Sequence, residues 1–593
     1  MTRILLIGLT LVAGGAYAQQ TTPAHAQLTQ LAEDITYTTA RLFPSQATAW
    51  GITKYDGDLE TPSEKDRAAY IAQLGDWQKR LHAIGKGGAA LSLVDRDDAQ
   101  LLDATLAQQL NALRVYQHDR KDYSLGANAF VNVIFLQLQF LPIAGRDGAT
   151  TATVDLAWAD IVSRLEKGPE FIAASQRLVT QPGHLYGTVG SDELAGAADL
   201  FNTALTDAAK AHFGEGTESL QKFVQARNAA LTAIASTKSF IDAHVAKWPE
   251  NFAMGRSAYD RLLHDEQLLP YSSEELQRIA ALQLARGWTE EAWLIAVSQQ
   301  EHRPFGPQSG GGLAPGGAAL VPYYRERIAE LQRFVIQHDV VTVPAWLGQI
   351  QVQETPAFLQ PLYPGASMNP PRLFSEGSVG FYFITPPVSL ADAAAHLDMN
   401  QDFDRDRILS TAAHEAMPGH FLQLSIARRH SDFIRKIQNS PVFEEGWAFY
   451  GEEMFVRLGL FGDHLDGRLD VARWERVRAA RVMVDVKLAC GEWSVQQAAD
   501  YFQRETSFTP QAAAAATAAI ATSPGYYIAY AVGRQQIEEL LESYLQKTGG
   551  QGTLHDFHDR LLSYGSTPLA IVGPELLADL DKPVAAVRAV ANF

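Results

Sequence analysis

The sequence HEAMPGH, from His414 to His420, most constrains how this chain can fold. If both histidines bind one metal ion, their rings must face the same point in space. On a regular α-helix a six-residue step turns about 240°, so the two rings would point apart. Pro418 lacks a backbone donor and clashes with the carbonyl group four residues earlier, and Gly419 tolerates irregular backbone. The motif therefore predicts a helix that breaks at Pro418 and Gly419 so that the histidines converge.

A second segment, EEGWAFYGEE, supplies the remaining ligand of the predicted metal centre. Neutral imidazoles of His414 and His420 and the carboxylate of Glu445 would hold one Zn²⁺ and leave one position open. Glu444 is the competing ligand. Glu445 is preferred because Glu452 follows seven residues later on the same helix face and can support the ligands. The alternative is an ordinary helix end with solvent-facing histidines and glutamates.

Glu415 adjoins the first histidine and is the predicted general base. Zinc lowers the pKa of bound water towards about 7, and Glu415 would accept its proton and later protonate the leaving amine. Tyr530 is the predicted donor to the developing oxyanion, with Tyr526 and Tyr527 as competitors. Each tyrosine can equally be a core aromatic residue. Gly533, in the same segment, would allow this helix to approach another closely.

Three arginines and one strand tyrosine are the further candidates for substrate contacts. A guanidinium group binds a carboxylate through two parallel hydrogen bonds, so Arg478, Arg481 and Arg534 are candidates for a substrate carboxylate. Ion pairs within the scaffold are the alternative role for them. The segment VGFYFIT, residues 379–385, is predicted to be an edge strand on which Tyr382 meets an extended peptide. Core packing of its aromatic residues is the alternative.

Helical periodicity dominates the rest of the chain. Apolar residues at steps of three or four predict amphipathic helices in the ranges 29–42, 97–118, 156–179, 218–247 and 272–297. Residues 348–355 and 379–385 lie between Pro- and Gly-rich turns and predict two or three short strands, and Asp404 is predicted to cap the helix that carries His414. We therefore expect a mainly α protein with a two-lobed helical, zinc-peptidase-like architecture and a small β-sheet next to the metal-binding helix.

The chain begins with a segment typical of exported proteins. Residues 1–18 contain one basic residue, an apolar run and an Ala-x-Ala site, which predict a signal peptide cleaved near Ala18. The Gly- and Pro-rich loop 303–317 is predicted to separate a helical N-terminal lobe, 19–302, from a metal-binding lobe, 318–593. No stretch reaches the roughly 18 apolar residues that span a bilayer. We expect a periplasmic or secreted protein without stable membrane insertion.

The composition of the chain argues against several classes of function. The net charge is −18, from 49 basic and 67 acidic residues, and no run of five basic residues occurs, so nucleic acid is not an expected partner. Cys490 is the only cysteine and cannot form an internal disulfide. The sequence has no GxSxG motif, so a serine or cysteine nucleophile has no support. The oligomeric state is left open.

Four blocks carry a resemblance to a known family. HEAMPGHFLQ, EEGWAFYGEE, RAARVMVD and PGYYIAYAVGRQQI resemble successive blocks of the domain of unknown function 885 family, a group of zincin-like, predominantly helical metallopeptidases. The resemblance implies a metal-dependent peptidase. The chain departs from the family pattern at Ala489, where a histidine is frequent, and at Ala519 and Ile520, where Arg-Tyr is frequent. These departures imply a difference in substrate binding and leave the metal ligands unchanged.

The sequence as a whole predicts an exported zinc peptidase that cleaves short peptides in a cleft between its lobes. The nearest alternative is a metal-dependent amidase that acts on a non-peptide amide. A periplasmic peptide-binding protein with a vestigial metal site is the alternative from another class. The presence of Glu415 argues against the last, because a binding protein needs no general base.

Overall fold

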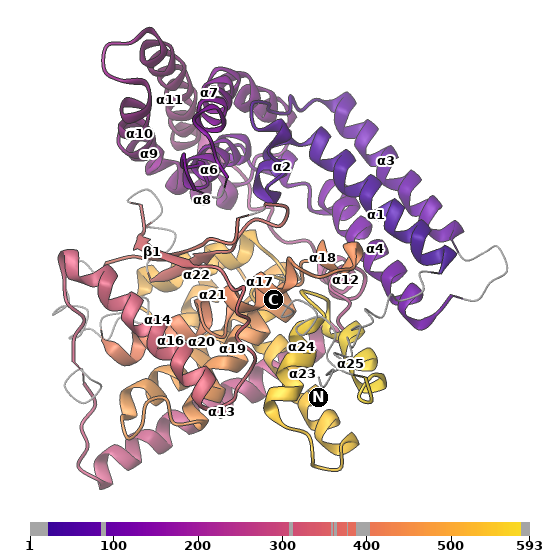
Figure 1. Ribbon diagram of the computed structural model, residues 1–593, viewed down its shortest axis with the longest axis vertical. Coiled ribbons are helices and arrows are strands. Elements are labelled where there is room, and N and C mark those ends of the chain that lie inside the picture. Colours follow the sequence, from indigo (N-terminus) through magenta and orange to yellow (C-terminus); the bar gives the residue numbers. More distant parts are fainter. Residues whose placement is uncertain are drawn as a thin grey trace, which may run out of the picture.

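The computed structural model describes residues 22–84, 91–146, 148–306, 312–356, 360, 365–375, 377–386 and 404–582. The predicted signal peptide lies outside these residues. Within them the chain is mainly helical with one small sheet, as predicted (Figure 1). No helix in these ranges is both long and apolar enough to cross a membrane.

The first half of the chain forms the upper layer of helices in Figure 1. Its helices are α1 (Pro23–Leu42), α2 (Pro44–Trp50), α3 (Glu64–Ala83), α4 (Leu93–Asn111), α5 (His118–Lys121), α6 (Leu125–Gln139), α7 (Thr151–Leu178), α8 (His184–Ala195), α9 (Ala197–Asn202), α10 (Ala204–Phe213) and α11 (Glu218–His244). The helices predicted within 29–42, 97–118, 156–179 and 218–247 are thereby confirmed. Phe130, Trp158 and Phe223 lie in the core that α6, α7 and α11 share.

The second half forms the lower body, which carries the predicted metal ligands (Figure 1). Its helices are α12 (Arg256–Arg261), α13 (Ser273–Gln300), α14 (Leu320–Gln337), α16 (Arg405–Glu415), α17 (His420–Ala427), α18 (Phe433–Lys436), α19 (Pro441–Arg457), α20 (Leu465–Ala489), α21 (Val495–Glu505), α22 (Pro510–Thr522), α23 (Ala529–Lys547), α24 (Leu554–Ser563) and α25 (Leu569–Ala578). The helix predicted within 272–297 is confirmed as α13.

The predicted lobe boundary at residue 302 differs from the division of the core. Leu276 and Ala280 of α13 pack with Val482 of α20 in one buried cluster. The Gln283 side chain also donates to the Ala531 carbonyl of α23 at 3.2 Å. The C-terminal body therefore begins before residue 302, and α12 and α13 belong to it.

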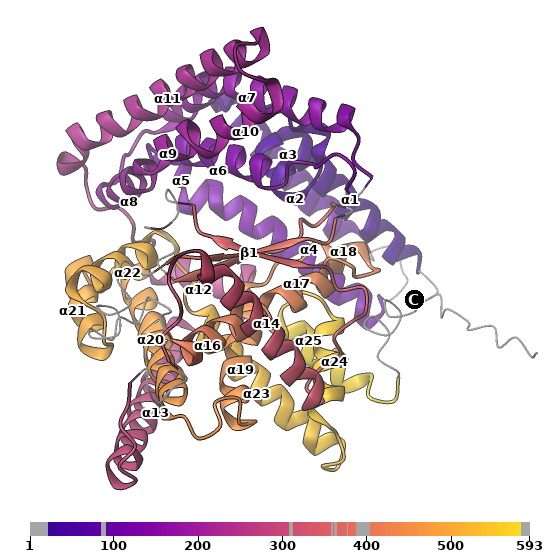
Figure 2. The ribbon, with the colours of Figure 1, turned by 60° about the vertical axis from the view of Figure 1, so that its left-hand side comes forward.

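The sheet lies between the two halves of the molecule (Figure 2). Its order is β1 (Ile350–Glu354), β3 (Gly380–Ile384) and β2 (Ala366–Asn369), with β3 parallel to β1 and antiparallel to β2. Every residue of β3 is buried. Phe383 packs into the N-terminal core, whereas Tyr382 on the other face packs into the core of the C-terminal half. Both faces are covered, which explains the unbroken apolar sequence GFYFI.

The prediction that VGFYFIT is an edge strand is wrong. β3 is the central strand, and its backbone groups are already paired on both sides. Tyr382 has no exposed surface and contacts the Tyr324 ring at 6.0 Å between centroids. Tyr382 is therefore a core residue and not a contact for substrate.

Candidate metal centre

The helix that carries the first histidine breaks where the sequence predicts. α16 runs from Arg405 to Glu415, and the carboxylate of Asp404 caps it as predicted by accepting hydrogen bonds from two backbone amides of the first turn. The Met417–Pro418 bond is cis, and α17 starts at His420. A Cβ atom on Gly419 would lie 1.8 Å from the His414 carbonyl oxygen, so only glycine fits this bend.

The break brings the three predicted ligands together. The rings of His414 and His420 lie 4.8 Å apart at 89°. Nε2 of each histidine is 3.3 Å from Glu445 Oε2, and the three ligand atoms lie within 4.8 Å of one another. Ligands held about 2.0–2.1 Å from a tetrahedral zinc ion are separated by about 3.3–3.4 Å. The chemistry of the donors and the two separations from Glu445 Oε2 therefore fit a zinc ion.

Glu444, the competing ligand, does not join this cluster. Its carboxyl group is near the Ser566 side chain, and burial raises its pKa. Successive residues of a helix point about 100° apart, so α19 directs only one of these two adjacent glutamates to the histidines. The structure places Glu445 in that position.

A buried carboxylate holds the first histidine in place. Glu452 Oε1 lies 2.7 Å from Nδ1 of His414. Arg478 donates two hydrogen bonds to Glu452, of 2.8 and 2.6 Å. A proton on Nδ1 that points at Glu452 leaves Nε2 free to serve as a ligand. Glu452 thus has the supporting position predicted for it.

Arg478 is a scaffold residue instead of the predicted substrate contact. It is 6% exposed, and its guanidinium lies 4.2 Å from the centroid of the Phe449 ring. Its charge is already balanced by Glu452. A substrate carboxylate would have to compete with a buried two-point ion pair.

The charges in the cluster compensate one another. Burial alone would lower the pKa of His414, but hydrogen bonds to Glu445 and Glu452 outweigh it and raise the pKa to about 9. Burial would raise the pKa of Glu445, but the charges of His420 and His414 hold it well below its usual range. With the side chains alone, a proton thus occupies the ligand set, and zinc binding must displace it.

Glu415, the predicted base, stands beside the cluster and is not one of the ligands. It is the last residue of α16 and is half-buried. Burial raises its pKa, and the nearby His414 and His420 oppose that effect. A carboxylate with a raised pKa is a better proton acceptor than an exposed one.

The three candidate tyrosines all lie at the site. Tyr526 donates from its hydroxyl to Glu445 Oε1 at 2.7 Å, while 39% of this residue remains exposed. The Tyr530 ring stacks on His414 with centroids 6.0 Å apart. Tyr527 lies edge-on to Tyr526 at 5.3 Å. Tyr530 as the oxyanion donor stays a prediction, and Tyr526 is the tyrosine in direct contact with a predicted ligand.

Of the remaining two arginines, only Arg481 is placed to meet a substrate. Arg534 is 1% exposed and bonds to Glu453 at 2.7 Å and Glu475 at 2.9 Å, so its predicted role in substrate binding does not fit. Arg481 is half-buried, and its guanidinium lies 5.2 Å from the Tyr530 ring centroid. Across the part of the chain that the structure describes, it has no carboxylate partner, and its Nε is buried without a hydrogen bond.

Two glycines fix the spacing between the ligand helix and the tyrosine helix. A Cβ atom on Gly446 of α19 would lie 2.5 Å from Gly533 Cα in α23. A Cβ atom on Gly533 would lie 1.9 Å from the Val442 carbonyl oxygen. The two backbones therefore cross in contact, as predicted for Gly533. The sequence analysis missed the partner, Gly446, although it directly follows the predicted ligand Glu445.

An aspartate that the sequence analysis did not single out fixes the turn before the tyrosines. Asp485 accepts hydrogen bonds from the Gly525 amide and the Tyr259 hydroxyl, both at 2.9 Å. Its signal was its place at the end of the RAARVMVD block. Of the three departures from the family pattern, Ala489 and Ile520 are core positions, 4% and 1% exposed, and Ala519 is half-buried.

The comparisons with known proteins give a family and a fold. The family model "Bacterial protein of unknown function (DUF885)" matches residues 44–576. A "putative lipoprotein of unknown function" from Shewanella oneidensis has 21% identity and a TM-score of 0.71, with 93% of this chain and 99% of that chain covered. A "putative lipoprotein" from Colwellia psychrerythraea has 18% identity and a TM-score of 0.75, with 95% and 100% covered.

These two solved structures share the fold with this chain at low sequence identity. No curated protein matches the chain. The family match spans the sheet, the helix break, the ligand cluster and the tyrosine helix. The chain therefore belongs to the DUF885 family of bacterial proteins of unknown function.

Proposed function

We propose that this protein is a zinc-dependent peptidase that hydrolyses short peptides. The observation that carries the proposal is the spacing of 3.3 Å from Glu445 Oε2 to the Nε2 atoms of both His414 and His420. Glu415 stands next to this ligand set, as a general base must. A metal-dependent amidase would use the same residues, and only a substrate survey separates the two.

Each residue of the site has a task in this reaction. Zinc held by the three ligands would polarise the scissile carbonyl group and acidify a water molecule. Glu415 takes a proton from the attacking water and returns it to the leaving amine. A tyrosine hydroxyl, from Tyr530 or Tyr526, donates to the oxygen that becomes negative. Glu452 keeps the His414 ring in the orientation that binding requires.

Arg481 supports the assignment to short peptides. It is a cation without a carboxylate partner in the described part of the chain, and it contacts Tyr527 and Tyr530. A free peptide carboxylate would form two parallel hydrogen bonds with its guanidinium. In this proposal the enzyme therefore recognises a short peptide by binding its terminal carboxylate.

An exported location completes the proposal. The predicted signal peptide favours export, and the two solved relatives are described as putative lipoproteins. Fractionation of the producing cells tests this location. Recovery of the protein with an uncleaved N-terminus in the cytoplasm would contradict it.

Glu415→Gln is the variant that tests catalysis. It removes the proton acceptor without removing a ligand, so we expect retained zinc and a loss of turnover of about 10² or more. Glu444→Gln is the matched control, because this half-buried glutamate lies outside the ligand cluster. Metal analysis and digestion of a peptide library, read by mass spectrometry, give both quantities. Full activity of Glu415→Gln would rule out its role as base.

Recognition of the carboxy terminus is tested with a peptide and its carboxy-amidated twin. Loss of a charged two-point contact should lower kcat/KM more than tenfold, roughly 1.5–3 kcal/mol. Arg481→Gln should cleave both peptides at the slower rate, whereas Arg504→Gln, an exposed arginine of α21, should still distinguish them. Equal rates for the two peptides with the wild type would reject recognition by Arg481.

A further inference from the structure

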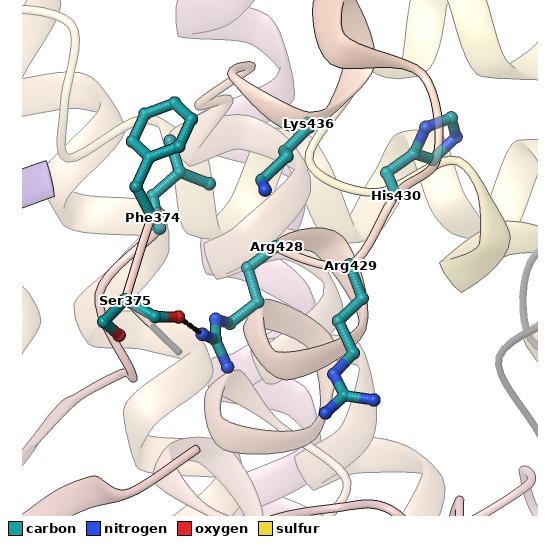
Figure 3. A pocket seen from close by; sticks show the side chains of 7 residues that line it. Phe374, Ser375, Arg428, Arg429, His430 and Lys436 are labelled. Carbon is teal, nitrogen blue, oxygen red and sulfur yellow. Dashed lines mark hydrogen bonds between the residues drawn. The ribbon is translucent and has the colours of Figure 1, made fainter. Parts of the chain in front are cut away.

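A second site-like feature lies at the other end of α17. A cavity of about 510 Å³ is lined by Phe374, Ser375, Arg428, Arg429, His430 and Lys436. Arg428 directly follows α17, which begins at His420. An eight-residue helix is about 12 Å long, so this basic pocket is separate from the metal centre. Figure 3 shows Lys436 and Arg428 extending toward the segment that carries Phe374 and Ser375.

The basic pocket concentrates positive charge that no neighbour balances. Within the described residues, no carboxylate lies within ion-pair distance of Arg428, Arg429 or Lys436, although the whole chain has a net charge of −18. Burial and the neighbouring Arg429 lower the pKa of Arg428, and burial and Arg428 lower the pKa of Lys436. The C-terminus of α17 contributes only about half a negative charge. Three cations therefore repel one another in a partly desolvated space, and an anion would relieve this repulsion.

The pocket also has specific contacts that orient its walls. Arg428 donates to the Ser375 carbonyl group, which fixes one cation against the opposite segment. Arg429 lies over the Trp346 ring at 4.2 Å from its centroid. Lys436 lies 5.1 Å from the centroid of Phe374, so an ammonium group and an aromatic face meet the same space. Its volume is within the range of small-molecule sites, roughly 300–1,000 Å³.

We propose that the basic pocket binds the phosphoryl group of a phosphate monoester or diester. A phosphoryl group offers several acceptor oxygens and up to two negative charges, which suit two guanidinium groups and one ammonium group better than a single carboxylate does. Phe374 supplies an apolar wall for the part of the molecule that bears the phosphate. The phosphoryl group belongs either to a free solute or to a lipid headgroup.

Binding is tested by calorimetry of the zinc-loaded, full-length protein with inorganic phosphate and with phenyl phosphate. We expect both to bind, phenyl phosphate more tightly, and benzoate to bind at least tenfold more weakly because it carries one charge. Lys436→Gln should weaken phenyl phosphate at least tenfold, and Arg428→Gln with Lys436→Gln should abolish binding. The matched control is Arg333→Gln with Lys210→Gln, which removes the same charge from exposed positions of the chain and should bind as the wild type does.

Three further measurements keep the test decisive. The variant His420→Ala should still bind phenyl phosphate, since phosphate held by a metal ion would be lost with that ion. Co-sedimentation with phosphatidylglycerol vesicles and, separately, phosphatidylcholine vesicles identifies the source of the phosphoryl group. Binding that depends on Lys436 and occurs only with phosphatidylglycerol vesicles assigns a lipid headgroup. Absence of such binding assigns a free solute. Circular dichroism checks that each variant is folded. No binding of phenyl phosphate by the wild type at millimolar concentration, or equal binding by folded Lys436→Gln, overturns the proposal.

Discussion

The charged side chains at the two ends of α17 differ in whether they have partners of opposite sign. At the start of α17, Glu445 lies against His420 and His414, and Glu452 pairs with Arg478, so the charges of the predicted ligand cluster balance one another. Beyond its end, Arg428 has Arg429 and Lys436 as neighbours and no carboxylate among the described residues. The first cluster is stable as a set of side chains and can exchange a proton for a metal ion. The second cluster has an excess of positive charge, which is why we propose that it binds an external anion.

The largest expected effect is loss of the metal in His420→Ala. Removal of one of three ligands should leave no stoichiometric zinc and no peptidase activity. His430→Ala is the matched change at the other end of α17 and should retain zinc, because His430 lines the basic pocket. Elemental analysis of both purified variants gives the answer. Stoichiometric zinc in His420→Ala would contradict the assignment of His420 as a ligand.

Glu452→Gln tests whether the compensated cluster depends on its support. We expect zinc affinity to fall about 10- to 100-fold, because the His414 ring loses its orienting carboxylate. The free energy of unfolding should fall by about 3 kcal/mol or more, because Arg478 loses its buried partner. Glu453→Gln, the next residue, also breaks a buried pair, with Arg534, but touches no ligand. Chelator competition should therefore separate the two variants, and an equal loss of zinc affinity in both would contradict the support role.

His558 sharpens the comparison with His414, since it is buried and pairs with no carboxylate among the residues that the structure describes. Burial lowers its pKa to about 4, and its ring faces the Tyr450 hydroxyl at 3.0 Å. Between pH 6.5 and 4 this histidine binds a proton in the unfolded chain but stays neutral in the folded chain. The free energy of unfolding therefore falls as pH falls. This group should account for about 3 kcal/mol of that loss. Urea unfolding of the wild type and His558→Gln across this range measures it, and parallel pH profiles would refute it.

The smallest effect concerns the uncompensated cations. Lys436→Gln removes a repulsive charge, so the free energy of unfolding should rise by about 0.5 kcal/mol at low salt and return to the wild-type value near 1 M salt. Lys210→Gln removes an exposed cation from an acidic protein and should give no gain. Urea unfolding at two salt concentrations measures both. A larger loss of stability in Lys436→Gln than in Lys210→Gln would show that the pocket's charges are balanced after all.

The features that the sequence predicted are those determined over a few residues. A proline followed by a glycine disfavours a continuous helix, and the two histidines flank Pro418 and Gly419, so the convergence of His414 and His420 follows from local geometry. The amphipathic helices follow from local periodicity in the same way. The mainly helical fold and its small sheet were predictable for this reason.

The features that the sequence did not predict depend on partners far along the chain. Arg481 and Arg534 are the same residue type in neighbouring blocks, but Arg534 is neutralised by Glu453 and Glu475 from two other helices. The central position of β3 depends on pairing with β1 and β2, although its unbroken apolar run was a usable signal for burial on both faces. The basic pocket forms only when residues 428–436 meet the segment at 374–375.

The crossing of Gly446 and Gly533 limits how this site can vary. No side chain separates the two helices there, so the distance from Glu445 to the tyrosines is set by two peptide backbones in contact. Core substitutions can neither widen nor narrow that distance by small steps, because the first added methyl group already collides with a backbone atom. In the proposed enzyme, a change of substrate preference would therefore come from residues at the rim, such as the exposed Tyr526 and the half-buried Arg481, while the separation of Glu445 from the tyrosines stays constant.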